Sequence, residues 1–544
     1  MKPHRAGLTA AGTVLVSVLA AALAACSSGS SYTAGTQSGA SPSASQSGQA
    51  ASAVFTYDTT AAVMVDGWDP ATEYSDGNIA MSEMYETLTH YDAATRTIEP
   101  QLATSWTSAD GAKTWTFKLR HGVTFHTGRP LTAQAAKAAI LRTVKLAAGA
   151  SYIWGAVKTI DTPDPYTLVF HLSAAAPLAL EASADYSAYI YDTQAGGGGS
   201  KLTSWLNAGH DAGTGPYTEQ TWNKGQEFEV TLKKFPQYWG GWSGAHFSQV
   251  VYRVVPEDTT AAQLLRSGQV SFIEQINSSL WSSFQGDSAI KQYSSPSWQN
   301  LLGQLNAQRL NVNVRQAILY AIDYNGIIAA LHGAGVASSG LIPPGLPGHS
   351  ADLPNYAYNK AKAAALLAKA GYGPGHKALN LTLTYTSGDS NEQVVATIIK
   401  SDLAALNVNL TAQSLAWPTQ WAKGKSDSAA QRQDIFLEYW WPDYADPYSW
   451  FVNTLETESP PYYNLSYYSS PALDKMINQA EPLLASNPAA AEQLYRTMQT
   501  TVLQQAPVVS LYNVNYQYAM LSHISGFQVN PAYPNEVFVY DLKP

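Results

Sequence analysis

The chain has 544 residues, of which 45% are hydrophobic, and it contains 15 Trp and 33 Tyr. This length exceeds what one compact core supports, so we expect two or three globular domains. The net charge is −9 at pH 7, and such an acidic surplus repels phosphate backbones, which argues against a nucleic-acid partner. The aromatic content favours a lined cleft, although tyrosine-rich surfaces are also common in secreted proteins.

The first 25 residues have the pattern of an export signal. Lys2 and Arg5 precede an apolar run over residues 6–25, which ends in small residues before Cys26, the single cysteine. The ending Leu23-Ala24-Ala25-Cys26 resembles the lipobox of bacterial lipoproteins. That resemblance implies cleavage before Cys26 and a diacylglycerol on its sulfur, which would anchor the protein at the outer face of the cell membrane. The alternative is an ordinary secretory signal with an incidental cysteine.

Residues 26–53 combine this cysteine with a Ser- and Gly-rich segment that carries no charged side chain. Such a composition cannot form a core, so we expect a flexible tether with a reach of about 28 Å. No later stretch holds 18 uninterrupted apolar residues, so we expect no membrane span in the folded part.

The first half of the folded part alternates strand and helix signals. We predict strands at residues 53–57, 114–119 and 167–172, and helices at residues 79–88 and from Thr132 to about 146. Ala135 stands where an acidic residue would complete a capping box with Thr132. The four glycines at 196–199 lack the following helix with Lys-Ser/Thr that a phosphate loop needs, so they predict a surface loop.

The second half has the same character. We predict strands at residues 379–386 and 435–439, a helix from an Asn359 cap to Gly371, and a helix with its cap at Asn487-Pro488. One set of residues with helical spacing is apolar except for Asp402: Val395, Ile398, Ile399, Asp402 and Leu406. After Asn487, the spacing predicts a buried stripe of Leu494, Met498 and Val502. Alternating strands and helices indicate α/β layers.

Residues 440–447 read Trp-Trp-Pro-Asp-Tyr-Ala-Asp-Pro and follow a predicted strand. The two prolines force the chain into a turn, which holds Asp443 at the strand end beside large aromatic rings. A carboxylate shielded from water there is suited to pair with a cation such as a peptide ammonium. The alternative is that Asp443 only caps the turn and that Trp440 and Trp441 are core.

Several motifs together resemble one known family. They are Tyr85-Glu86-Thr87-Leu88, Leu102-Ala103-Thr104-Ser105-Trp106, residues 110–120, Gly122-Val123-Thr124-Phe125-His126, Pro130-Leu131-Thr132-Ala133, Gly213-Thr214-Gly215-Pro216-Tyr217, Tyr238-Trp239, Val314-Arg315-Gln316-Ala317-Ile318, Ala321-Ile322-Asp323, Ile342-Pro343-Pro344 and residues 361–372. In this order they resemble the family 5 extracellular solute-binding proteins, the peptide- and nickel-binding receptors of ABC importers.

The resemblance implies an α/β, two-lobed periplasmic-binding-protein-like fold of type II, in the large cluster with an extra N-terminal subdomain. We expect lobe 1 at residues 54–305, with that subdomain at about 93–200, lobe 2 at 306–509, and a return to lobe 1 at 510–544. Two strand-like crossings, near residues 302–306 and 510–514, would form the hinge.

The same resemblance implies that ligand binds between the lobes. Asp443 would pair with the free amino terminus of a peptide, and main-chain groups of Tyr439 and Trp441 would run along it like an added strand. Trp440 belongs to the same segment, and Trp417 is either a pocket wall or plain core. Tyr74 and Ser75 would face the cleft from the opposite lobe. Three residues are candidates for binding the ligand carboxylate: Lys423, Arg432 and Arg309.

Partners implied by the resemblance are a dipeptide or oligopeptide, the permease and ATPase subunits of an ABC importer, and the membrane through the lipid on Cys26. We expect a monomer without cofactor, metal or enzymatic activity. Gly-x-Ser-x-Gly and His-Glu-x-x-His are both absent from the sequence, and Gly424-Lys425-Ser426 lacks the earlier glycine of a phosphate loop. His121 and His126 match the ordinary hairpin of the family. A receptor for a nickel chelate, an oligosaccharide or a peptide signal is the alternative.

Overall fold

The computed structural model describes residues 53–59, 65, 67–74, 76–224, 228–274, 276–353, 355–533 and 535–544. The predicted signal peptide, Cys26 and all of the predicted tether except Ala53 lie outside these residues. In the described ranges, no helix has both the length and the apolar character needed to cross a membrane.

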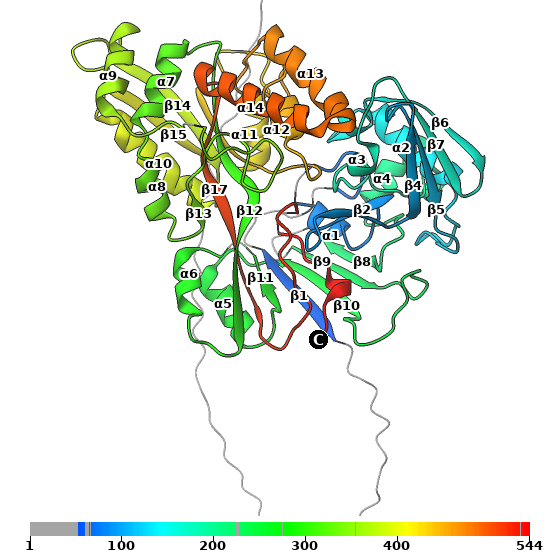
Figure 1. The fold of residues 1–544 in the computed structure, drawn as a ribbon. Coiled ribbons are helices and arrows are strands. Elements are labelled where there is room, and N and C mark those ends of the chain that lie inside the picture. The colour runs from blue at the N-terminus through cyan, green and yellow to red at the C-terminus, as the bar shows by residue number, and fades with distance from the viewer. Residues whose placement is uncertain are drawn as a thin grey trace, which may run out of the picture. The chain divides into compact units, whose positions relative to one another are not determined.

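One large mixed sheet runs through the described chain (Figure 1). Its strand order is β15-β14-β16-β12-β17-β11-β1-β10-β9-β8, and β13 pairs with β17 beside this path. The strands are β1 (Val54–Thr59), β8 (Tyr217–Asn223), β9 (Glu229–Lys234), β10 (Gln249–Val254), β11 (Phe272–Ile273), β12 (Ile290–Leu305), β13 (Gly335–Val336), β14 (Leu379–Thr386), β15 (Val408–Leu415), β16 (Ile435–Trp440) and β17 (Val508–Leu521). Parallel pairs at β14–β15 and β1–β10 flank the antiparallel centre.

The centre of this sheet is the antiparallel pair β12–β17, the two longest strands. Figure 1 shows them side by side, passing from the region of α7–α10 to the region of α5 and α6. Their register shifts between Pro296 and Asn300 and again between Leu301 and Leu302. Both predicted crossings, near residues 302–306 and 510–514, fall largely within these two strands.

A second sheet has the order β4-β5-β7-β6 and is separate from the large one. Its strands are β4 (Ala103–Ala109), β5 (Thr114–Leu119), β6 (Val157–Asp164) and β7 (Thr167–Leu172), and a hairpin of β2 (Thr89–Asp92) and β3 (Thr97–Pro100) precedes it. Helix α2 (Ala133–Leu146) packs against β6 and β7. Buried Ile140 and Phe170 belong to one apolar cluster, which also takes in residues of α12–α14.

The remaining helices pack on the sheets and on one another. Helix α10 packs on β14 and β15, and α13 packs against α14 (Figure 1). The helices are α1 (Asn78–Met81), α3 (Leu178–Glu181), α4 (Leu202–Leu206), α5 (Asp258–Arg266), α6 (Ser278–Ser283), α7 (Val312–Ala321), α8 (Tyr324–Ala330), α9 (Lys360–Lys369), α10 (Ser390–Ala404), α11 (Trp417–Gly424), α12 (Tyr448–Thr454), α13 (Pro471–Ser486) and α14 (Pro488–Gln505).

Several predicted elements are confirmed at their predicted ends. The strand at 114–119 is β5, the strand at 379–386 is β14, and Thr132 caps α2 by accepting the Ala135 N–H. Asn359 accepts the Lys362 N–H at the start of α9, and Asn487 accepts the Ala490 N–H at the start of α14. The structure also explains Asp402, whose carboxylate accepts the backbone N–H of Asp323 at 2.9 Å.

The predicted helix at 79–88 is wrong beyond its first turn, because α1 ends at Met81. The backbone carbonyls of Glu83 and Met84 instead accept hydrogen bonds from the N–H groups of Tyr217 and Gly215. Glu86 forms an isolated bridge with Ile190. These long-range contacts outweigh the local helical pattern. The stripe on α14 also differs, since Leu494 is only half-buried while Tyr495 and Met498 are fully buried.

Candidate binding cleft

The turn after β16 holds Asp443 at the edge of a pocket of about 550 Å³, a volume that includes space open to solvent. Tyr74, Ala150 and Tyr186 line it from the N-terminal part of the chain. The other lining residues come from α11, β16, the turn after it, α12 and the loop before α13. They are Trp417, Trp421, Glu438, Tyr439, Trp440, Trp441, Asp443, Asn453 and Tyr463. We call this pocket the aromatic compartment.

Asp443 is held by a residue that lies far away in the sequence. The hydroxyl of Tyr152, in a short 3-10 turn at Ser151–Trp154, donates to the Asp443 carboxylate. The backbone carbonyl of Asp443 accepts the Asp185 N–H at 3.3 Å. Burial raises the pKa of Asp443 to about 6, and hydrogen bonds from Tyr152 and Asn453 limit that rise. A cation would therefore meet a carboxylate that is ionised at neutral pH and poorly hydrated.

Aromatic rings form much of the lining of the same pocket. Trp417 and Trp421 stack with centroids 5.4 Å apart, and Tyr463 lies 5.3 Å from Trp421. Tyr74 is 6.4 Å from both Trp421 and Tyr463, and the Trp440 ring is 5.7 Å from Tyr463. Ring faces attract cations and stack on flat apolar groups, so this wall suits an ammonium as well as an apolar side chain.

Glu438 adds a second carboxyl group to the aromatic compartment. It lies on β16, is only 2% exposed, and accepts a hydrogen bond from the Gln304 side chain. Burial raises its pKa to about 8, so at neutral pH it is largely protonated. Glu438 can therefore act as a neutral hydrogen-bonding group rather than as a second fixed negative charge.

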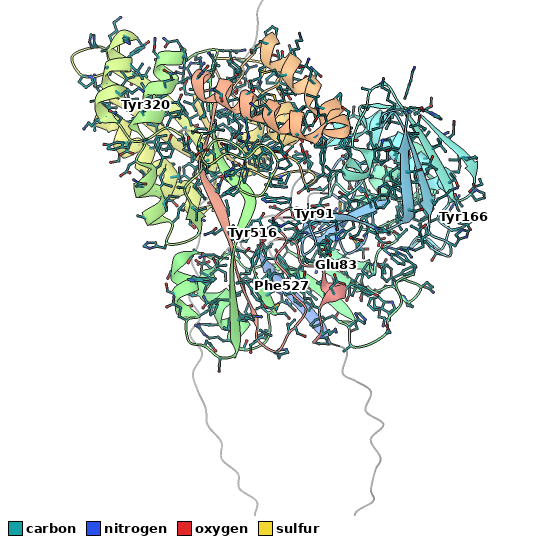
Figure 2. The ribbon with its side chains drawn as sticks, in the orientation of Figure 1. Glu83, Tyr91, Tyr166, Tyr320, Tyr516 and Phe527 are labelled. Carbon is teal, nitrogen blue, oxygen red and sulfur yellow. The ribbon has the colours of Figure 1, made fainter. Side chains whose placement is uncertain are left out.

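A second pocket, of about 590 Å³ with open space included, lies on the other side of Tyr439. Its wall includes the segment before α10, the first residues of α10, residues of β12, β16 and β17, and three residues from loops. The lining residues are Ile276, Gln299, Ala334, Gly388, Asp389, Ser390, Asn391, Tyr439, Val514, Asn515, Tyr516, Gln517 and Asn535. Figure 2 shows Tyr516 on β17, the strand that contributes the largest share of this wall. We call it the polar compartment.

Six of the seven ligand-binding residues predicted from the sequence line the aromatic compartment: Asp443, Trp441, Tyr439, Trp440, Trp417 and Tyr74. Ser75 lies outside the described residues. Trp417 stands in the wall and packs on Trp421 and Phe436, so it serves both as wall and as packing partner.

None of the three carboxylate-binding candidates lines either compartment. Arg309 pairs with Asp434 at 2.9 Å, and the charges of Arg309 and Lys423 limit the rise that burial causes in the pKa of Asp434. The Arg432 guanidinium donates to the Ser426 carbonyl and stacks 4.4 Å over Tyr467. Arg309 and Arg432 are therefore engaged elsewhere, and the structure places none of the three candidates in the wall of either compartment.

Sequence reasoning missed half of the aromatic compartment. Trp421 follows Trp417 by one helical turn, and this spacing alone could have placed both on one face. Glu438 lies two residues before Trp440 on β16, so the two side chains share a face, and this could have indicated an inward carboxyl group. Ala150, Tyr186, Asn453 and Tyr463 carry no such signal, because their position depends on tertiary packing.

His121 and His126 each contact other side chains or the backbone in the described chain. His126 contacts Asp211 and the Gly215 carbonyl in a buried network, and His121 stacks on Tyr166 with centroids 3.7 Å apart. In the described ranges no group of three or more His, Cys, Asp or Glu side chains could hold a metal ion. Gly424 ends α11 rather than opening a helix, so the Gly424-Lys425-Ser426 sequence is not arranged as a phosphate loop.

Comparisons with known proteins agree with this architecture. The chain is 28% identical to the probable D,D-dipeptide-binding periplasmic protein DdpA of Escherichia coli K12, over 85% of this chain and 89% of that protein. It is 25% identical to the glutathione-binding protein GsiB of Escherichia coli O157:H7, over 79% and 83% of the two chains.

Solved structures share the fold. The periplasmic binding protein DppA of Helicobacter pylori, in complex with the peptide STSA, matches with a TM-score of 0.78 and 24% identity, over 90% of this chain and 98% of that one. The oligopeptide-binding protein AppA of Bacillus subtilis, in complex with a nonapeptide, matches with a TM-score of 0.78 and 18% identity, over the same shares. The fold is therefore the two-lobed, type II periplasmic-binding-protein fold.

The family model for bacterial extracellular solute-binding proteins, family 5, matches residues 97–461, which is well over half of the chain. The motifs at residues 110–133 and 213–217 lie within this match, as do Trp417, Asp443 and the aromatic residues around them. The chain belongs to the family 5 bacterial extracellular solute-binding proteins.

Proposed function

We propose that this chain is the substrate-binding lipoprotein of an ABC importer and that it captures short peptides through their free amino terminus. It would deliver them to the permease and ATPase subunits and would bind rather than transform its ligand. Its relatives include proteins named for binding dipeptides, glutathione and oligopeptides.

One observation carries the proposal. Asp443 lines the aromatic compartment, its pKa of about 6 leaves it charged at neutral pH, and Tyr152 and Asn453 fix its carboxylate. A peptide ammonium is the complementary charge, and the interaction gains strength where water is scarce. Main-chain groups of Tyr439 and Trp441 would run beside it along an extended peptide, like an added strand.

The chemistry of capture follows from the position of the pocket. Tyr74, Ala150 and Tyr186 on one side and β16 with its turn on the other line the same pocket, so they would enclose a ligand together. A ligand that contacts both sides binds the closed form more tightly than an open one, so binding favours closure. We take residues 54–305 with 510–544 as lobe 1, residues 306–509 as lobe 2, and β12 and β17 as the hinge.

Placement at the membrane is the second part of the proposal. Lipid on Cys26 would hold the protein at the outer face of the cell membrane, and the tether at 26–53 would let the folded part, acting as a monomer, reach the permease. The lipobox-like Leu23-Ala24-Ala25-Cys26 supports this.

Calorimetry with matched peptides tests the amine pairing. Free dipeptides should bind at least tenfold more tightly than their N-acetylated forms, and Asp443→Asn should remove most of that difference, because the amide carries no charge. Asp474→Asn, on α13 and outside both compartments, is the matched control and should leave the ratio unchanged. Equal affinity of free and acetylated peptides for the unaltered protein would overturn the proposal.

The stacked pair Trp417–Trp421 supports a second candidate, an oligosaccharide ligand, since flat ring faces also suit sugars. Tight binding of neutral oligosaccharides, with no response to Asp443→Asn, would favour that candidate instead.

A further inference from the structure

The polar compartment has unused hydrogen-bond acceptors. Asn515 Oδ1, Gln517 Oε1 and Asn535 Oδ1 are buried, and none has a hydrogen-bond partner within the part of the chain that the structure describes. Gln517 is 5% exposed and Asn535 is 4% exposed, and all three residues line the pocket. Buried acceptors without partners are costly, so this compartment is prepared for a group that donates hydrogen bonds.

The orientation of one amide is fixed by its neighbour. The Asn515 Nδ2 group donates to the Gly333 carbonyl at 3.0 Å, which accepts but cannot donate. The nitrogen and oxygen of the Asn515 amide therefore cannot be exchanged, and Oδ1 is the atom that needs a hydrogen-bond donor from the compartment.

The start of α10 does not offer an anion site here. Asp389 caps the helix and accepts the N–H of Glu392 at 2.8 Å, and its carboxylate also receives the N–H of Asn391. The protein's own carboxylate thus occupies the position that a ligand anion would take at a helix N-terminus. The hydroxyl of Tyr439 donates to the same Asp389 at 3.5 Å, and Tyr439 lines both compartments.

The charge of the whole cleft has one sign. Asp443 and Asp389 are the charged side chains that line the two compartments, since Glu438 is largely protonated at neutral pH, and neither pocket wall in the described chain contains a Lys, Arg or His. A ligand carboxylate placed in the polar compartment would face Asp389 without a cation to neutralise it. Like-charge contact in a poorly hydrated site disfavours such a ligand strongly.

We propose that the polar compartment binds an N–H-donating group without negative charge, so that the preferred ligand is a short peptide bearing a basic side chain or an amidated carboxyl end. This inference rests on the proposed peptide-binding function and narrows its substrate class. The peptide ammonium lies at Asp443, the chain passes Tyr439, and the second donor group reaches Asn515, Gln517 and Asp389.

Four dipeptides test it by calorimetry at pH 7: Ala-Leu, Ala-Leu-amide, Ala-Arg and Ala-Glu. We expect Ala-Leu-amide, Ala-Arg or both to bind at least tenfold more tightly than Ala-Leu, with Ala-Glu weakest. A gain for the amide alone identifies the chain end as the bound group, and a gain for Ala-Arg alone identifies the side chain. Affinity of Ala-Glu or Ala-Leu equal to that of both Ala-Arg and Ala-Leu-amide would overturn the inference.

Variants separate this inference from the proposed function. Asp389→Asn retains a good helix cap and should reduce the advantage of Ala-Arg over Ala-Leu at least threefold, whereas Asp402→Asn near the other end of α10 should not. Asn391→Lys places an ammonium at the compartment and should strengthen Ala-Glu binding. If free dipeptides outbind acetylated ones while Ala-Glu matches Ala-Arg and Ala-Leu-amide, only this inference fails. If no dipeptide binds, the proposed function fails.

Discussion

At the scale of single residues, Asp443 shows how a turn residue becomes a binding group. Its sequence context explains the turn through Pro442 and Pro447, and Pro447 also precedes the first residue of α12. The position and the pKa of its carboxyl group depend on the hydrogen bond from Tyr152, which is 291 positions earlier in the chain. The first feature is local and readable in the sequence, and the second arises only when the chain folds.

The pKa of Asp443 predicts how affinity depends on pH. In the ligand-free protein this pKa is about 6, raised by burial, so the carboxyl group is charged at pH 7 and mostly protonated at pH 5. A bound ammonium favours the charged form, so protonation competes with binding. We expect the affinity for a free dipeptide to fall about tenfold from pH 7 to pH 5, as measured by calorimetry.

Asp443→Asn provides the control. Because its amide does not titrate, the affinity of this variant for the dipeptide should be nearly constant between pH 5 and pH 7. An unaltered protein with the same affinity at both pH values would show that no carboxyl group titrating near pH 6 holds the ligand.

At the scale of elements, local patterns were sufficient where an element is amphipathic and capped. The strands β5 and β14 and the capped starts of α2, α9 and α14 follow from periodicity and from Thr or Asn at the cap. Prediction failed after Met81, where the backbone of Glu83 and Met84 is required for contacts with Gly215 and Tyr217. Local propensity cannot anticipate a partner 130 positions away.

The Gly213–Tyr217 segment gives a prediction at this scale. It lies so close to the chain near Glu83, labelled in Figure 2, that a Cβ on Gly213 would stand 1.9 Å from the Met84 carbonyl oxygen. The clash involves the backbone of both segments, so neither can move away without a large cost in free energy. We expect Gly213→Ala to lower the free energy of unfolding by more than about 3 kcal/mol, as measured by chemical denaturation.

Gly268→Ala is the matched comparison for this effect. Gly268 has a φ of 72° with no atom within 4 Å of an added Cβ, so only the left-handed backbone is strained and the cost should be about 1 kcal/mol. Similar losses for the two variants would contradict close backbone approach as the reason for glycine at 213.

At the scale of the whole molecule, the described chain buries many carboxyl groups without basic partners. Burial raises the pKa of Glu274, Glu438, Glu481 and Glu536 to about 8 in each case. In the unfolded chain these groups titrate near their ordinary value of 4.5. Between these values the folded protein binds more protons than the unfolded chain, so stability falls as pH rises. The sequence reports only that the chain is acidic, whereas the burial of these groups is a product of the fold.

The ligand-free protein should accordingly be more thermostable at pH 5 than at pH 8. Asp69 and Asp211 have lowered pKa values, so their stabilising contribution to the free energy of unfolding is fully present above about pH 4. It does not change between pH 5 and pH 8. We expect a melting temperature at least about 3 °C higher at pH 5, by differential scanning fluorimetry at constant ionic strength. Glu274→Gln can retain the hydrogen bond from Tyr57 while removing one titrating group, and it should reduce this difference. A melting temperature that rises from pH 5 to pH 8 would mean that these carboxyl groups are hydrated or paired with cations in solution, because buried and unpaired acids take up protons on folding and so favour the lower pH.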